Sequence, residues 1–206
     1  MREGAAMGGE VTRGGLPILL FEDAAALERW LEAQPAEHPG LWLQFAKKGS
    51  GERSVSVQEA IDAGLCFGWI DGLKNRFDER FFLLRYTPRR ARSKWSLINV
   101  ERAEVLLNEG RVRPGGLRQI EAAKADGRWA AAYPPASRME VPADLAAALE
   151  ADPVAKAEFE ALRGGERYSV LYRLHQVRGV EKRAVAVKTV LELIGSPPHS
   201  SGTSNL

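Results

Sequence analysis

Five basic side chains between residues 85 and 94 are the densest group of potential binding residues in the sequence. They are Arg85, Arg89, Arg90, Arg92 and Lys94, and no acidic residue lies among them. Like charges at this spacing repel one another, because physiological salt largely screens charges only when they are more than roughly 8–10 Å apart. The segment therefore predicts an anionic partner, which is either an acidic surface of the same fold or a separate ligand.

Neutral hydrogen-bond donors and an aromatic ring accompany these cations. A guanidinium is a planar fork of donors that matches a phosphate or a carboxylate, and hydroxyl and amide groups can complete the contacts. We therefore predict an anion-binding site with the candidate residues Arg85, Thr87, Arg89, Arg90, Ser93, Trp95 and Asn99, together with Asp71 and Lys47. In the alternative interpretation, the arginines join the sheet to the helices by pairing with the acidic N-terminal region and with Asp71, Asp78 and Glu79.

Asp71 is the one acid in the apolar run Cys66–Gly72, and it permits two interpretations. As a general base, or as the carboxylate that orients an arginine, it would support catalysis. As the first residue of an Asp-Gly pair it is typical of a turn, which is the interpretation that we favour. Cys66 is predicted to end a helix in apolar surroundings, which raises a thiol pKa and disfavours a nucleophile.

Several common kinds of site have no support in the sequence. Lys47–Gly51 combines lysines with small residues but lacks the phosphate-binding pattern G-x-x-x-x-G-K-[ST]. The hydrolase and dinucleotide-binding motifs G-x-S-x-G and G-x-G-x-x-G are also missing. No His, Cys or acidic residues have the spacing of metal ligands. We therefore expect neither a metal site nor a cofactor, and we assign no catalytic residue.

The apolar patterns around the basic segment predict an α+β fold. Leu41–Ala46 alternates like a strand, and Arg80–Tyr86 is apolar enough for a central strand. Ser56–Glu59 has the capping-box pattern, which predicts a helix to about Leu65, and Ser96 can cap the helix after the basic segment. The expected architecture is a small mixed or antiparallel sheet with packed helices, followed by a helical C-terminal module.

The composition of the chain divides it into five parts. The chain has 206 residues, 45% of them hydrophobic, which is enough for one substantial core and a small second module. We predict a disordered N-terminus (1–15), an α+β domain with the basic motif (16–127), a linker (128–141), a helical module (142–195) and a disordered tail (196–206).

The basic character is local to one segment. Residues 74–118 carry 12 Lys/Arg and 5 Asp/Glu, a net charge of +7, whereas the whole chain carries +2. One cysteine excludes a disulfide framework, the N-terminus lacks a signal-peptide pattern, and no apolar run reaches the roughly 18–20 residues that span a bilayer. We therefore expect a cytoplasmic protein without a membrane span, whose partner is an anionic small molecule or an acidic protein surface. The sequence does not determine the oligomeric state.

Several of these segments also carry a family resemblance. The motifs are Leu41–Gly49, Ala63–Gly72, Tyr86-Thr-Pro-Arg-Arg90, Ser93-Lys-Trp-Ser96, Asn99 and Gly110. With the helical region from Val141 to Ile194, they resemble the bacterial YdeI/OmpD-associated family, also called the bacteriocin-protection or OmdA-type family, over roughly residues 16–195. The resemblance implies resistance to antimicrobial peptides or bacteriocins and association with an outer-membrane porin. It supplies no catalytic residue.

We interpret the chain as a non-enzymatic stress-response protein of this family that binds an anionic ligand at its arginine-rich segment. An enzyme that acts on a phosphorylated or carboxylated small molecule is one alternative, with Asp71 as the base and the arginines as a clamp. A nucleic-acid-binding protein is another, in which Tyr86 and Trp95 stack on bases. The low net charge of the whole chain disfavours nucleic acid as a partner.

Overall fold

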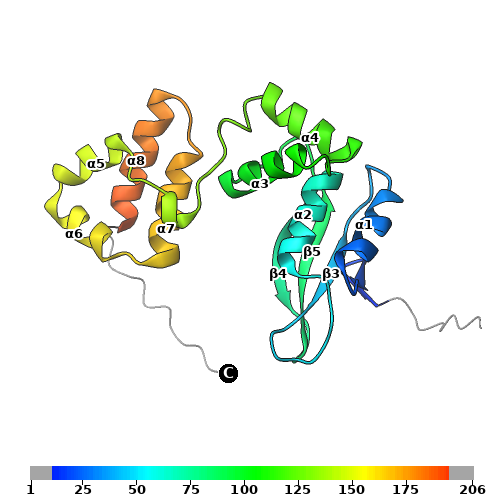
Figure 1. Ribbon diagram of the computed structural model, residues 1–206. Helices are drawn as coiled ribbons and strands as arrows, with labels where there is room; N and C mark the ends of the chain where they lie inside the picture. Colours follow the sequence, from blue (N-terminus) through cyan, green and yellow to red (C-terminus); the bar gives the residue numbers. More distant parts are fainter. Residues whose placement is uncertain (1–10, 195–206) are drawn as a thin grey trace, which may run out of the picture. The chain divides into compact units, whose positions relative to one another are not determined.

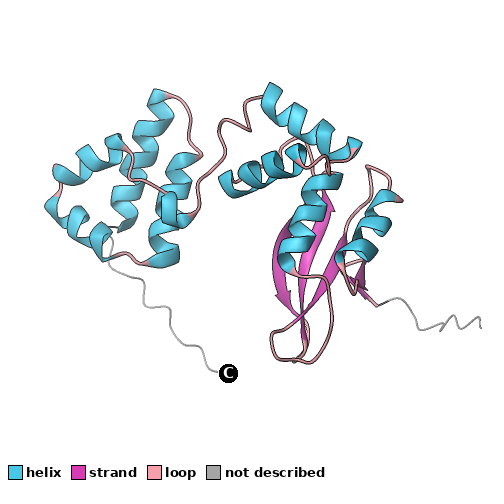
Figure 2. Ribbon diagram, in the orientation of Figure 1, coloured by secondary structure: helices cyan, strands magenta, loops and turns pink. Residues whose placement is uncertain are grey.

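The computed structural model describes residues 11–194 and divides the chain into two compact units between Ala132 and Tyr133. In the described residues the first unit is a sheet with helices, and the second unit is helical (Figures 1 and 2). The structure therefore confirms the predicted α+β class with a helical C-terminal region.

A mixed sheet forms the centre of the N-terminal unit. Its strand order is β1-β2-β3-β5-β4, with β2 and β3 parallel and all other neighbours antiparallel. The strands are β1 (Thr12–Arg13), β2 (Leu16–Leu20), β3 (Leu41–Ala46), β4 (Trp69–Arg76) and β5 (Phe81–Pro88). The short β1 corrects the prediction of disorder for residues 11–15, and the rest of that predicted segment, 1–10, lies outside the described residues. The predicted tail 196–206 lies outside them as well.

Two capped helices pack on one face of this sheet (Figure 1). Asp23 caps α1 (Ala24–Glu32) by accepting a hydrogen bond from the Ala26 N–H, and the predicted capping box of Ser56 opens α2 (Val57–Phe67). Alternate residues of β3 and β5 meet these helices, as the two-residue period of a strand requires. The buried residues of this cluster include Leu27, Leu31, Leu41, Leu43, Phe45, Ala60, Ala63, Leu84 and Tyr86.

Two further helices pack against α2 at one end of the sheet (Figure 1). Ser96 caps α3 (Leu97–Asn108) as predicted, and α4 (Pro114–Ala125) begins with a proline. Their shared core includes Leu65, Cys66, Trp95, Val100, Ala103, Leu106, Ile120 and Ala123. This cluster anchors the basic segment at its C-terminal end, because Trp95 is 2% exposed.

The C-terminal unit is a separate helical core. Its elements are the 3-10 helix η1 (Ala136–Arg138) and the helices α5 (Ala143–Glu150), α6 (Pro153–Ala161), α7 (Gly164–His175) and α8 (Val180–Ile194). Their apolar stripes meet in a cluster that includes Leu145, Leu149, Phe159, Leu171, Leu174, Val187 and Val190. The predicted linker 128–141 spans the division between the units: Trp129 packs on Trp95 in the first unit, and Tyr133 packs on Tyr172 in the second.

Candidate functional site

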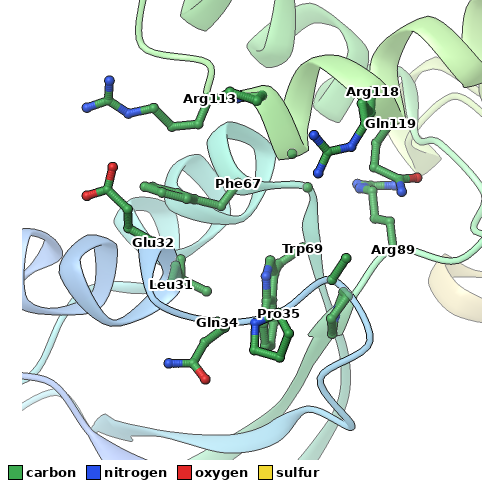
Figure 3. A pocket seen from close by; sticks show the side chains of 15 residues that line it. Leu31, Glu32, Gln34, Pro35, Phe67, Trp69, Arg89, Arg113, Arg118 and Gln119 are labelled. Carbon is green, nitrogen blue, oxygen red and sulfur yellow. The ribbon is translucent and has the colours of Figure 1, made fainter.

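A cavity of about 240 Å³ lies in the N-terminal unit between the loop after α1, the junction of α2 with β4, the end of β5 and the start of α4 (Figure 3). Its wall combines basic, amide and apolar side chains. The lining residues include Trp69, Arg89, Arg113, Arg118 and Gln119.

Close backbone packing of α4 on α2 shapes this cavity. Gly68 ends α2 in the left-handed conformation, with a φ of 81°, which lets the chain enter β4 at the next residue. Gly115 and Gly116 open α4, and a Cβ atom at either position would collide with main-chain oxygens of α2. Glycine at these positions therefore brings the N-terminus of α4 against the C-terminus of α2, where their opposite dipole charges attract.

Arg89 is the most buried basic residue of this segment, with 5% of its surface exposed. Its backbone N–H donates to the Gly68 carbonyl at 2.8 Å, and its Nη1 donates to the Lys94 carbonyl at 3.2 Å. Its guanidinium carbon lies 3.9 Å from the centroid of the Trp95 ring, a cation–π contact. These contacts fix a positive charge in the wall of the cavity.

Arg118 and Gln119 lie beside Arg89 on one side of the cavity, whereas Arg113 and Glu32 lie on the opposite side (Figure 3). Within residues 11–194, neither Arg113 nor Arg118 forms an ion pair. Glu32 is the one acid in the wall. The Arg89–Arg118 side therefore carries positive charge without a carboxylate, and the adjacent N-terminus of α4 adds to the positive potential.

A second, smaller cavity of about 180 Å³ adjoins the first. The two share Ala36, Pro88 and Arg89, and the second is also lined by Glu37, His38, Pro39, Thr87 and Arg90. Arg90 is exposed and forms no ion pair in the described part of the chain. The Arg89 side chain is therefore part of two neighbouring basic walls.

His38 is held in the second cavity by an aromatic cluster. Its ring lies 5.3 Å from that of Trp30 and 5.4 Å from that of Trp69, and its Nδ1 accepts a hydrogen bond from the Gly40 N–H at 3.0 Å. Burial lowers the pKa of His38, which favours the neutral ring, and a neutral ring whose Nδ1 accepts a hydrogen bond carries its proton on Nε2. His38 therefore brings an N–H donor to this cavity without a charge.

The candidate residues predicted from the sequence divide between this region and other parts of the unit. Thr87, Arg89 and Arg90 line the two cavities. Lys47 follows β3 at the opposite end of the sheet, where its Nζ donates to the Asp78 carbonyl at 2.6 Å. Lys47 and Arg89 lie at opposite ends of β5. This strand has 8 residues and is therefore about 25 Å long, at about 3.3 Å per residue. Lys47 is therefore not brought together with the arginines.

Asp71 and Arg85 lie within strands. Asp71 is part of β4, opposite Tyr86, so the turn that we expected at Asp71-Gly72 is absent and a β-bulge follows instead. Arg85 pairs with Trp42 and therefore points to the sheet face opposite the one that carries Tyr86 and Asp71. Neither Asp71 nor Arg85 lines the two cavities described above.

Of the remaining candidates, Ser93 and Trp95 lie between β5 and α3, and Asn99 lies in the first turn of α3. The Ser93 hydroxyl accepts from the Arg90 N–H at 2.9 Å, and the Ser93 carbonyl accepts from Arg128 Nη1 at 2.9 Å. The Asn99 N–H donates to the Ser96 hydroxyl in the helix cap. The Trp95 ring is buried between Arg89 and Trp129. The contacts of Ser93 with Arg90 and of Trp95 with Arg89 help to position these two arginines.

Sequence reasoning missed the residues that α4 contributes, chiefly Arg118 and Gln119. A partial signal was present: Arg113-Pro-Gly-Gly116 pairs a helix-starting proline with glycines that permit close approach. Arg118 follows one helical turn later. It lines the cavity because α4 packs against α2, and this tertiary contact is not visible in the sequence.

We predict that the Cys66 thiol is inert in the folded protein. It is 1% exposed, and burial raises its pKa to about 11, so roughly one thiol in a thousand is ionised at pH 8. A disulfide reagent at pH 8 should therefore leave the native chain unlabelled and modify one thiol per chain in guanidinium chloride. Fast labelling of the native chain would contradict this assignment.

Within residues 11–194, no group of three or more His, Cys, Asp or Glu side chains is arranged to hold a metal ion. Over the same residues, no helix has the length and apolar character that crossing a membrane requires.

Comparisons with known families assign different descriptions to the two halves of the chain. Residues 19–119, which contain both cavities, match a domain of unknown function, DUF8412. Residues 138–195 match the family described as bacteriocin-protection, YdeI or OmpD-associated (OmdA). No curated protein and no solved structure matches the chain significantly.

Proposed function

We propose that the chain is a non-enzymatic cytoplasmic protection protein with a small anionic ligand, on the basis that residues 138–195 match the YdeI/OmpD-associated, bacteriocin-protection family. The family suggests a bacteriocin-protection type of role. The ligand is assigned here to the N-terminal unit, at the cavity that contains Arg89 and Arg118.

The observation that carries the ligand proposal is the charge of this cavity wall. Arg89 is buried and held by backbone contacts, while Arg118 enters from α4 and forms no ion pair within residues 11–194. Two guanidinium groups and the Gln119 amide present donors that suit a phosphate or a carboxylate. The apolar floor, which includes Phe67 and Trp69, suits the organic part of a small molecule.

The same geometry favours binding over the two alternatives. Asp71, which the enzyme alternative required as a general base beside the arginines, does not line this cavity. Trp95, which we considered as a platform for bases, has its ring in contact with Arg89 and Trp129 in the core. Base stacking requires an accessible ring face.

The ligand proposal is tested by thermal unfolding in the presence of inorganic phosphate, glucose 6-phosphate, citrate and short single-stranded DNA, at two salt concentrations. A ligand at 100 times its dissociation constant stabilises the folded state by about 2.7 kcal/mol. We expect at least one small anion to raise the melting temperature. Arg118→Ala should lower the affinity for that anion roughly tenfold or more, because a hydrogen bond to a charged group contributes about 1.5–3 kcal/mol.

Arg92→Ala is the matched control, since Arg92 is exposed in the same basic segment but lines neither cavity. It should respond to anions like the wild type. The ligand proposal is wrong if no anion stabilises the protein or if Arg118→Ala binds as tightly as Arg92→Ala. A response to DNA alone that falls steeply with salt would favour the nucleic-acid alternative. Survival of bacteriocin-treated cells that express each variant then tests whether the site serves protection.

A further inference from the structure

The two cavities beside Arg89 form a pair with one common wall. Ala36, Pro88 and Arg89 line both, so the cavities are neighbours on the same edge of the N-terminal unit. Pro88 restricts the backbone before Arg89, and the Arg89 N–H is bonded to Gly68, which keeps this wall in place. The arrangement resembles two adjoining compartments of one site more than two unrelated hollows.

Each compartment also has a basic group of its own. Arg118 and Gln119 belong to the first cavity only, and Arg90 and His38 belong to the second only. The acids in the walls are Glu32 in the first and Glu37 in the second, and both are exposed. Arg90 and Arg118 form no ion pair in the described part of the chain. Each compartment can therefore receive one anionic group.

We infer that the ligand of this site carries two anionic groups on a short carbon skeleton, as a sugar bisphosphate does, with one group beside Arg118 and the other beside Arg90. This inference rests on the proposed anion-binding function and makes it more specific. The volumes of about 240 and 180 Å³ suit a compact metabolite and not a polymer. Joining the two anions in one molecule raises the local concentration of the second group once the first is bound.

Calorimetric titration with two probes tests this arrangement. Fructose 6-phosphate carries one phosphoryl group and fructose 1,6-bisphosphate carries two on the same skeleton. We expect the wild-type protein to bind the bisphosphate at least tenfold more tightly than the monophosphate at matched ionic strength. Arg118→Ala should lower the affinity for both probes, because the first compartment is the more basic one. It contains Arg89, Arg118 and the N-terminus of α4.

Arg90→Ala is the decisive variant. It should remove most of the bisphosphate advantage while it changes the affinity for the monophosphate by less than about threefold. Arg92→Ala removes the same charge outside both cavities and should preserve the advantage, which controls for the net charge of the protein.

The possible failures are distinguishable. If neither probe binds, and inorganic phosphate and citrate also fail, the proposed function itself is wrong. If the monophosphate binds in a manner that depends on Arg118, but the bisphosphate is no tighter, the first cavity is an anion site and the two-compartment inference is wrong. Equal losses for Arg90→Ala and Arg92→Ala would also overturn it, because the advantage would then come from charge in general.

Discussion

Replacing Gly116 with alanine should destabilise the N-terminal unit by about 3 kcal/mol, near the upper end of the penalties for overpacking. A Cβ atom at this position would lie 2.5 Å from the Leu65 carbonyl oxygen and closer still to that of Cys66. Both neighbours are main-chain atoms in the last turns of α2, so they cannot rotate away as a side chain would. The clash must move α4 away from α2.

Tryptophan fluorescence during chemical unfolding measures this effect in the correct unit. All five tryptophans of the chain lie before Ala132, so their signal reports on the N-terminal unit alone. Gly72→Ala is the control, because a Cβ atom there meets its nearest neighbours at 3.7–3.8 Å, an ordinary contact distance. It should change the free energy of unfolding by less than about 1 kcal/mol.

Gly116→Ala should also weaken anion binding under conditions in which the unit stays folded, because α4 carries Arg118 into the cavity. If Gly116→Ala instead unfolds like Gly72→Ala and binds phosphate like the wild type, the close approach of α4 to α2 is not required. The cavity would then owe its shape to other contacts.

Local chemistry made much of this fold predictable from the sequence. Asp23, Ser56 and Ser96 each supply a side-chain oxygen for free N–H groups of a first helical turn, and each helix begins where that chemistry places it. The strand at Leu41–Ala46 was predicted with its observed bounds, because its residues alternate with the two-residue period of a strand. Such signals depend on neighbours within a few residues.

The turn predicted at Asp71-Gly72 shows where local reasoning fails. An Asp-Gly pair favours a turn, but here β5 provides a full partner for β4, and the strand continues through the pair. The irregularity appears instead as a bulge between residues 71 and 74. Tertiary pairing therefore overrode a local preference at this position.

The candidate site was predictable only in part, for a related reason. The sequence pointed to Arg89 through the density of charge around it. The sequence did not distinguish Arg89 from Arg85. Arg89 lines the wall of a cavity, whereas Arg85 pairs with Trp42 three residues before the end of β5. Arg118 lies outside the basic segment altogether, and it reaches the site through the packing of α4 on α2.

The Asp62–Arg102 ion pair should be the other large contributor to the stability of this unit. Arg102 in α3 donates from Nε and Nη2 to the two carboxylate oxygens of Asp62 in α2, at 2.8 and 2.5 Å. Gln58 donates to the same carboxylate at 3.0 Å. We expect Asp62→Ala to cost about 2 kcal/mol, below the roughly 3–5 kcal/mol of fully buried pairs, because the Arg102 side chain is 31% exposed.

The pH dependence of this effect identifies the carboxylate as its source. Burial alone would raise the pKa of Asp62, but the hydrogen bonds from Arg102 and Gln58 outweigh burial and hold that pKa below its ordinary value. The carboxylate therefore contributes fully above the unfolded-state pKa of about 3.9, and its contribution is lost as the pH falls through the lower folded-state pKa. The stability difference between the wild type and Asp62→Asn should accordingly shrink below about pH 4.

Glu52→Ala provides the matched control, because Glu52 forms an exposed pair with Arg80 at 2.6 Å. Exposed pairs contribute about 0–1 kcal/mol, so its effect on tryptophan-monitored unfolding at pH 7 should be less than half that of Asp62→Ala. Equal effects of the two variants, or a difference between wild type and Asp62→Asn that persists at low pH, would contradict the assignment. In that case the packing of α3 on α2 would depend on its apolar cluster, with the ion pair adding orientation alone.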